Sequence, residues 1–277
     1  MSRSFNQPHW CSSGWRKRDP SSRCIAFTLV ELLVVIAVIA ILASLLLTAL
    51  SGAKVRSKTA FCLNNMKQLQ ECWHMYAHDN DDIMVPNNYV GSVIMGTTNG
   101  PVMNEDQMTW CMGIAPTSTD EITYGTSLLF MYNLNAAIYH CPADLTEIQD
   151  HPGMPRKRSY NLSNSANCSM DNHFRMCSEI RQTEELFTFI DTHEDEIFDS
   201  TFGVIPETEY FFNNYWLDVP ADRHGRGANI AFADGHAEHW RWLANKFGSE
   251  FISQSYSDDD LTDLRRLQQH IKGAGGN

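Results

Sequence analysis

The sequence predicts an α+β protein, in which one long N-terminal helix packs on an antiparallel β-sheet head with irregular insertions. The helix is indicated by an apolar run from Phe27 to Leu50 and by apolar residues at three- and four-residue spacing after it, with no proline before Pro86. The sheet is indicated by alternating, aromatic-rich runs on both sides of Asp234-Gly235, a dipeptide typical of a two-residue hairpin turn.

The apolar run is long enough to cross a membrane. About 24 residues rising 1.5 Å each span a hydrocarbon core of roughly 30 Å, and Glu31 is the one charged residue among them. Residues 1–26 form a polar leader that contains more basic residues than the segment directly after the run. This asymmetry predicts a cytoplasmic N-terminus and an exported head. We therefore expect a transmembrane helix over residues 27–50.

Residues 51–80 are predicted to continue the helix in amphipathic form. Their apolar residues recur on one helical face, and polar residues fill the positions between them. The members of this stripe are Val55, Cys62, Met66, Leu69, Trp73 and Tyr76. We expect the stripe to pack on the sheet, with a short coiled coil as the minor alternative.

Residues 81–250 are assigned to a periplasmic α+β head and residues 251–277 to a C-terminal helix and flexible tail. Glu185–Asp191 has the composition of a strand, and Ala137–Pro142 is predicted as a strand ended by proline. Asp259–Ile271 is predicted as a helix because its acidic start and later basic residues complement the helix dipole.

Charge and cysteine content limit the function classes. The net charge of −12 argues against nucleic-acid binding, which needs basic patches. A solvated acidic surface is the simpler interpretation, and divalent-cation binding by some carboxylates is the alternative. Cys168 and Cys177 bracket a loop and are the local pair that could form a disulfide in an oxidising compartment. No Cys-x-x-Cys pair is present, which argues against a zinc ribbon.

The start of the apolar run resembles a known export signal. Ala26-Phe27-Thr28-Leu29-Val30-Glu31, followed by LLVVIAVIAILASLL, is similar to the class III signal of type IV prepilins and type II secretion pseudopilins. The resemblance implies that a prepilin peptidase cuts between Ala26 and Phe27 and that Phe27 is then N-methylated. The residue before the cut is normally Gly in that family, and here it is Ala26.

The same resemblance gives Glu31 a role in assembly. A carboxylate within an apolar helix is costly in hydrocarbon and needs a partner. In pilin-like filaments that partner is the methylated N-terminal amine of a neighbouring subunit; the alternative is that Glu31 reaches to the membrane interface. The implied partners are the peptidase, other pilin-like subunits and inner-membrane lipid, without nucleic acid.

A second motif lies near the C-terminus, where His224 is followed after nine residues by Asp234-Gly235. This spacing resembles a prepilin-like family of planctomycete- and verrucomicrobium-type bacteria. Three further segments share the resemblance: Cys62-Leu63-Asn64-Asn65, Cys141-Pro142-Ala143-Asp144 and Arg158-Ser159-Tyr160. The family implies no activity for the head. We expect His224 to hydrogen-bond the Asp234 turn; the alternative is a calcium site with Asp191, His224 and Asp234 as candidate ligands. No other cofactor is expected.

The predicted function is therefore that of a pilin- or pseudopilin-like structural subunit, not an enzyme. It is expected in the bacterial inner membrane and in a periplasmic or surface filament. One alternative is a membrane-anchored envelope protein whose acidic head binds a glycan or divalent metal without assembling. Another is an anchored hydrolase that uses His224, Asp234 and the acidic cluster, which comprises Asp191, Glu194, Asp195, Glu196 and Asp199.

Overall fold

A computed structural model describes residues 28–87, 108–123, 125–168, 173–248 and 252–272. The chain divides into two compact units, Met1–Leu50 and Ser51–Asn277. The helix α1 (Leu29–Asp79) contributes its start to the first unit and its remaining residues to the second. The predicted α+β class is confirmed, and the helix ends within one residue of its predicted end at His78.

The described part of the first unit is the apolar beginning of α1. Every described side chain from Leu29 to Leu50 is exposed, and by length and composition this helix can cross a membrane. Thr28 and Glu31 form a capping box at its start. The Thr28 hydroxyl accepts the N–H of Glu31 at 3.2 Å, and the Glu31 carboxylate accepts the Thr28 N–H at 2.8 Å.

The second unit contains a five-stranded sheet in the order β3-β1-β2-β5-β6. Its strands are β1 (Tyr160–Ser163), β2 (Phe187–Asp191), β3 (Thr201–Phe202), β5 (Gly227–Phe232) and β6 (Ala237–Arg241). The sheet is mixed and not purely antiparallel as predicted, because β3 pairs parallel to β1. The chain leaves β2 beside the start of β1 and enters β3 from that same end of the sheet, so β3 runs in the direction of β1. A second sheet joins β4 (Tyr215–Trp216) and β7 (Ser253–Gln254).

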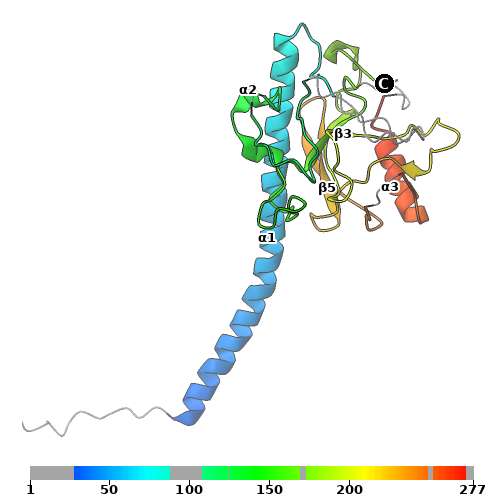
Figure 1. Ribbon diagram of the computed structural model, residues 1–277. Helices are drawn as coiled ribbons and strands as arrows, with labels where there is room; N and C mark the ends of the chain where they lie inside the picture. Colours follow the sequence, from blue (N-terminus) through cyan, green and yellow to red (C-terminus); the bar gives the residue numbers. More distant parts are fainter. Residues whose placement is uncertain (1–27, 88–107, 124, 169–172, 249–251, 273–277) are drawn as a thin grey trace, which may run out of the picture. The chain divides into compact units, whose positions relative to one another are not determined.

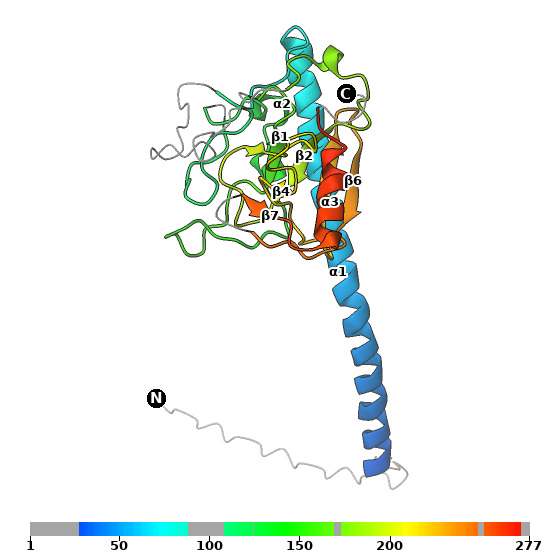
Figure 2. The same ribbon diagram turned by 90° about the vertical axis from the view of Figure 1, so that its right-hand side faces the viewer.

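The five-stranded sheet lies between two helices. Residues 51–79 of α1 run along one side of the strands, and α3 (Asp258–Gln268) lies along the other side (Figure 1). Figure 2 shows α3 in front of the strands, viewed from its own side. Each face has its own apolar cluster. The central strands β2 and β5 are therefore covered on both faces and are buried at every position, whereas the edge strand β6 is partly exposed.

The predicted apolar stripe of α1 is buried from Cys62 to Trp73, and Tyr76 is half-buried. Cys62, Met66, Leu69 and Trp73 have no exposed surface, whereas Val55 is exposed. Complete burial of side chains of this size contributes about 1.5–3 kcal/mol each. The packing of this helical face on the sheet is thus a principal source of stability for the second unit.

The hairpin between β5 and β6 is present, but its predicted turn is wrong by one residue. The turn contains Ala233, Asp234 and Gly235, and it closes through hydrogen bonds from Gly235 N–H to Phe232 O and from Phe232 N–H to His236 O. Gly235 has φ +98°, a conformation that favours glycine. Ala233 does not pair with β6, because its N–H donates a hydrogen bond to the carbonyl oxygen of Leu186, the residue before β2. Trp240 accordingly faces Ala228, whereas the predicted two-residue turn would have placed it opposite Asn229.

Three short helices complete the described secondary structure: α2 (Phe130–Asn133), η1 (Ala136–Tyr139) and η2 (Cys177–Glu179). The segment predicted as a strand at residues 137–142 is therefore mainly the 3-10 helix η1. The Asn135 side chain accepts the N–H of Ala137 at 3.1 Å and so starts a helical turn where apolar composition suggested a strand. The predicted C-terminal helix is found as α3, capped by Ser257.

A comparison of two glycines tests the close packing of the hairpin. A methyl group on Gly227 would overlap the Trp240 carbonyl oxygen and lie 2.5 Å from the His239 ring, whereas one on Gly52 would meet nothing within 4 Å. We expect Gly227→Ala to lower the free energy of unfolding by about 1–3 kcal/mol. Gly52→Ala should leave it unchanged or raise it by up to about 1 kcal/mol. Urea unfolding of the full chain in detergent, followed by tryptophan fluorescence, measures both. Equal stability of the two variants would contradict the close approach.

Candidate functional site

Four polar side chains from four separate segments converge in the core of the second unit. They are Cys62 on α1, Cys141 after η1, Asp191 at the end of β2 and His224 in the turn before β5. All four are buried, and the atoms through which they could bind a metal all lie within 4.8 Å of one another. A buried group of four potential ligands is uncommon, because burying polar side chains costs free energy unless they have compensating partners.

The distances show that these atoms surround one point. His224 Nε2 lies 3.1 Å from Asp191 Oδ2 and 3.2 Å from Cys141 Sγ. Cys62 Sγ lies 3.9 Å from the same Asp191 oxygen. Two sulfur atoms, one imidazole nitrogen and one carboxylate oxygen therefore face each other in a space closed to solvent.

The backbone places Asp191 and His224 through local pairing. Ala221 N–H bonds to the Asp191 carbonyl at 2.8 Å, which brings the segment before β5 to the end of β2. Directly after His224, Gly225 and Arg226 adopt φ values of +72° and +66° and reverse the chain. Gly225 meets this requirement without strain. The reversal directs the chain into β5 and leaves the His224 ring beside Asp191.

Each of the four side chains also has a partner outside the cluster. Thr59 Oγ1 lies 3.3 Å from His224 Nδ1, the ring nitrogen that does not face the cluster. The Tyr160 hydroxyl donates to Cys62 Sγ at 3.1 Å, and the Ala143 N–H donates to Cys141 Sγ at 3.4 Å. Asp191 uses its other oxygen, Oδ1, to bind Arg223.

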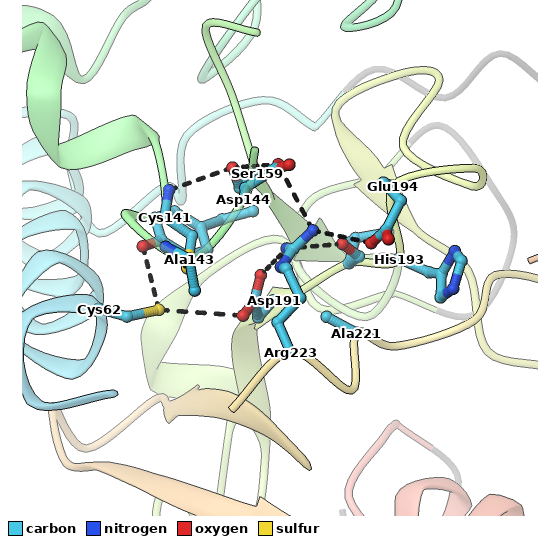
Figure 3. Close-up of polar contacts among 12 residues, drawn as sticks. Cys62, Cys141, Ala143, Asp144, Ser159, Asp191, His193, Glu194, Ala221 and Arg223 are labelled. Atoms are coloured by element: carbon cyan, nitrogen blue, oxygen red, sulfur yellow. Dashed lines mark hydrogen bonds and ion pairs between the residues drawn. The ribbon is translucent and has the colours of Figure 1, made fainter. Parts of the chain in front are cut away.

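Arg223 is the main buried cation beside the cluster. Figure 3 shows its guanidinium among three carboxylates, where Nη2 contacts Asp191 and Nη1 lies 3.4 Å from Asp144 and 3.2 Å from Glu194. Ser159 Oγ donates to Asp144 at 2.7 Å and fixes that carboxylate. Although burial opposes its charge, these carboxylates raise the pKa of Arg223. Arg223 therefore stays charged and compensates the buried carboxylates.

The electrostatics favour charged groups inside the cluster. The hydrogen bond from Cys62 lowers the pKa of Cys141 to about 6 despite burial. Burial opposes protonation of His224, but its contacts with Asp191 and Cys141 raise its pKa to about 9. Burial raises the pKa of Cys62. His224 Nε2 thus lies against both the Asp191 carboxylate and the Cys141 sulfur.

The structure brings together two of the three residues that the sequence singled out as metal ligands. Asp191 and His224 meet, but Asp234 lies on the hairpin turn, where its Oδ1 contacts His236 Nδ1 at 2.6 Å. The expected hydrogen bond between His224 and the Asp234 turn is therefore wrong. The six residues of β5 separate the two positions, and a strand of that length spans about 20 Å.

Sequence reasoning missed Cys62, Cys141 and Arg223 as members of this site. The first two belong to the short motifs Cys62-Leu63-Asn64-Asn65 and Cys141-Pro142-Ala143-Asp144, and Tyr160 to a third. In the structure these motifs meet around His224. Considered as one constellation, the motifs would have predicted the site. Arg223 directly precedes His224, and no motif in the sequence singled it out as a site residue.

Two other candidates have different surroundings. Cys177 is a free thiol, so the disulfide suggested with Cys168 is not formed. Cys177 opens η2 with its N–H on Asp82 O, whereas Cys168 pairs with Asn87, and these different backbone partners position them independently. The hydrolase alternative needs an accessible histidine, but the His224 side chain has no exposed surface.

The predicted processing site falls at the edge of the described chain. Ala26 and Phe27 lie outside the described residues. Glu31 stands in the first turn of α1, exposed and bound to Thr28. Its position within the apolar helix agrees with the prediction from the sequence.

Comparison with known proteins supports the N-terminal assignment. Residues 21–47 match the family model of the prokaryotic N-terminal methylation motif. No curated protein and no solved structure matches the chain. The match covers the N-terminal segment and is typical of membrane-anchored pilin- and pseudopilin-like proteins, which are structural subunits. The resemblance of the head motifs to a particular prepilin-like family stays a prediction.

Loss of Arg223 should destabilise the head strongly. Arg223→Met leaves Asp191 and Asp144 buried without their cation, and we expect a loss of about 3–5 kcal/mol in the free energy of unfolding. Lys157→Met is the matched control, because Lys157 pairs with the exposed Glu121, and such pairs contribute at most about 1 kcal/mol. Denaturant unfolding of both variants measures the difference. Similar losses would show that Arg223 is not needed for charge compensation.

Proposed function

We propose that this chain is a pilin-like subunit that is cut between Ala26 and Phe27, methylated on Phe27 and assembled into a type II secretion or type IV pilus-like filament. The observation that carries the proposal is the methylation motif over residues 21–47, placed at the start of an exposed apolar helix. A cleaved signal peptide would be discarded. A cut before Phe27 keeps the helix on the mature protein and makes it available for assembly.

The exposed apolar surface of the helix suits two environments, the lipid of the membrane and the interior of a filament. The stretch from Leu29 to Leu50 exposes large apolar side chains on all sides, and apolar surface of that extent is unfavourable in water. Lipid covers it while the subunit is held in the inner membrane. Neighbouring helices cover it in the filament, so that the same residues serve as anchor and as assembly surface.

Glu31 gives the assembled helices their register. Within the subunit its carboxylate caps the helix by binding Thr28. An ionised carboxylate in an apolar environment still favours a cationic partner, and the methylated amine of a neighbouring subunit supplies one. The Glu31 contact then occurs at a single axial offset between neighbouring helices.

Processing provides the first test. Expressed in cells with an active prepilin peptidase, the full chain should yield a mature N-terminus at methylated Phe27, detected by mass spectrometry of the membrane fraction. Ala26→Gly should increase the fraction cleaved, since Gly is the usual residue before the cut, and Ala26→Leu should block cleavage. A leader that stays intact, or a mature end at another residue, would contradict the proposal.

Two substitutions separate the charge of Glu31 from its capping role. Glu31→Gln keeps a side chain that can complete a capping box but removes the charge. Thr28→Ala keeps the charge and removes the capping hydroxyl. With a cysteine introduced at Ala43, we expect disulfide crosslinks between subunits to be lost in Glu31→Gln and retained in Thr28→Ala. Equal crosslinking in both variants would contradict the role of the Glu31 charge, and the absence of crosslinks in every variant, wild type included, would favour a membrane-anchored protein that does not assemble.

A further inference from the structure

We propose that Cys62, Cys141, Asp191 and His224 bind one Zn²⁺ ion in a closed structural site. The proposal is independent of filament assembly, because all four residues lie within the second unit. It rests on the types of donor atom, on their distances and on the second layer of contacts that holds each donor.

The donor set matches the preferences of zinc. Two thiolates, one imidazole and one carboxylate form a four-ligand set of sulfur, nitrogen and oxygen, which is typical of structural zinc sites. Calcium and magnesium prefer six or more oxygen ligands or an octahedral shell of oxygens, so the two sulfur atoms argue against them. The sequence-based alternative of a calcium site is replaced by a site for a softer metal.

The distances suit a tetrahedral ion. Zinc binds sulfur at about 2.3 Å and imidazole nitrogen or carboxylate oxygen at about 2.0 Å, which places donor atoms of a tetrahedron roughly 3.3–3.8 Å apart. The observed separations are 3.1 Å from His224 Nε2 to Asp191 Oδ2, 3.2 Å from His224 Nε2 to Cys141 Sγ and 3.9 Å from Cys62 Sγ to Asp191 Oδ2. These three separations lie within a few tenths of an ångström of the tetrahedral values, and all four donor atoms lie within 4.8 Å of one another.

The outer contacts are those that orient metal ligands. A metal-binding histidine usually engages its second ring nitrogen with an acceptor, and a ligating carboxylate is itself hydrogen-bonded. Here Thr59 Oγ1 lies beside His224 Nδ1, and Arg223 binds the Asp191 oxygen turned away from the cluster. The Tyr160 hydroxyl and the Ala143 N–H donate to the two sulfur atoms and would stabilise their anionic form.

The proposed role is structural. All four ligands come from the protein and are buried, so no position is left open for a substrate. The ion would join α1 to the end of β2, to the loop after η1 and to the turn before β5. Since such a site does not exist in the unfolded chain, zinc binding would be coupled to folding of the head.

Metal analysis of the full chain tests the proposal. The protein is purified in detergent through a tag without histidine, and its metal content is measured by plasma mass spectrometry; we expect about one Zn²⁺ per chain. Cys62→Ser, Cys141→Ser and His224→Gln should each lose most of the zinc. Cys72→Ser is the matched control, since Cys72 is a buried thiol on the same helix outside the cluster, and it should retain the zinc.

Cobalt substitution keeps the test decisive if a ligand variant fails to fold. Wild-type protein depleted of zinc and loaded with Co²⁺ should show the intense visible bands of tetrahedral cobalt and a thiolate-to-cobalt charge-transfer band. Loading should also raise the melting temperature relative to the metal-free protein. Cys72→Ser should give the same spectrum.

Three results would overturn the proposal. The first is wild-type protein without a stoichiometric transition metal that also gives no thiolate–cobalt spectrum. The second is a disulfide between Cys62 and Cys141, found by mass spectrometry of alkylated peptides. The third is zinc retained in folded Cys62→Ser and His224→Gln. Each result is independent of leader cleavage, so failure here leaves the proposed assembly function intact.

Discussion

The head depends on the compensation of a buried carboxylate at the end of its central strand. Asp191 closes β2, and its side chain has no exposed surface. A carboxylate in that position is unfavourable unless cations or donors surround it. Arg223 binds one oxygen and His224 approaches the other. Because both residues lie in the turn before β5, the compensation of Asp191 also fixes the path of the chain into the hairpin.

The same point connects the head to its helix. Cys62 on α1 faces Asp191, and Tyr160, which is opposite Asp191 in the sheet register, donates to the Cys62 sulfur. The apolar stripe of α1 is part of the core on this face, while the polar cluster specifies how the helix is placed on the sheet. Apolar packing alone tolerates small displacements of a helix, whereas directional contacts to sulfur and carboxylate do not.

The two parts of α1 have different roles. Its first part exposes apolar side chains and carries Glu31 as a single charged group, and its second part is built into the head. For a pilin-like subunit this division separates the assembly surface from the folded domain. A structural metal beside the second part would hold the helix in the head while its first part leaves lipid for a filament.

Local sequence was enough to predict the helix, the apolar stretch at its start, the methylation motif, the central strand and the existence of the hairpin. These features depend on the periodicity and composition of neighbouring residues. Three further features emerge from the packing of the chain: the three-residue turn at Ala233–Gly235, the parallel pairing of β3 and the meeting of Cys62, Cys141, Asp191 and His224. Strand register and side-chain convergence depend on contacts between distant segments, and no local pattern in one sequence fixes which distant segments meet. His224 illustrates this limit. Its spacing in the sequence suggested a contact with Asp234, whereas the packing of the chain places its ring beside Asp191.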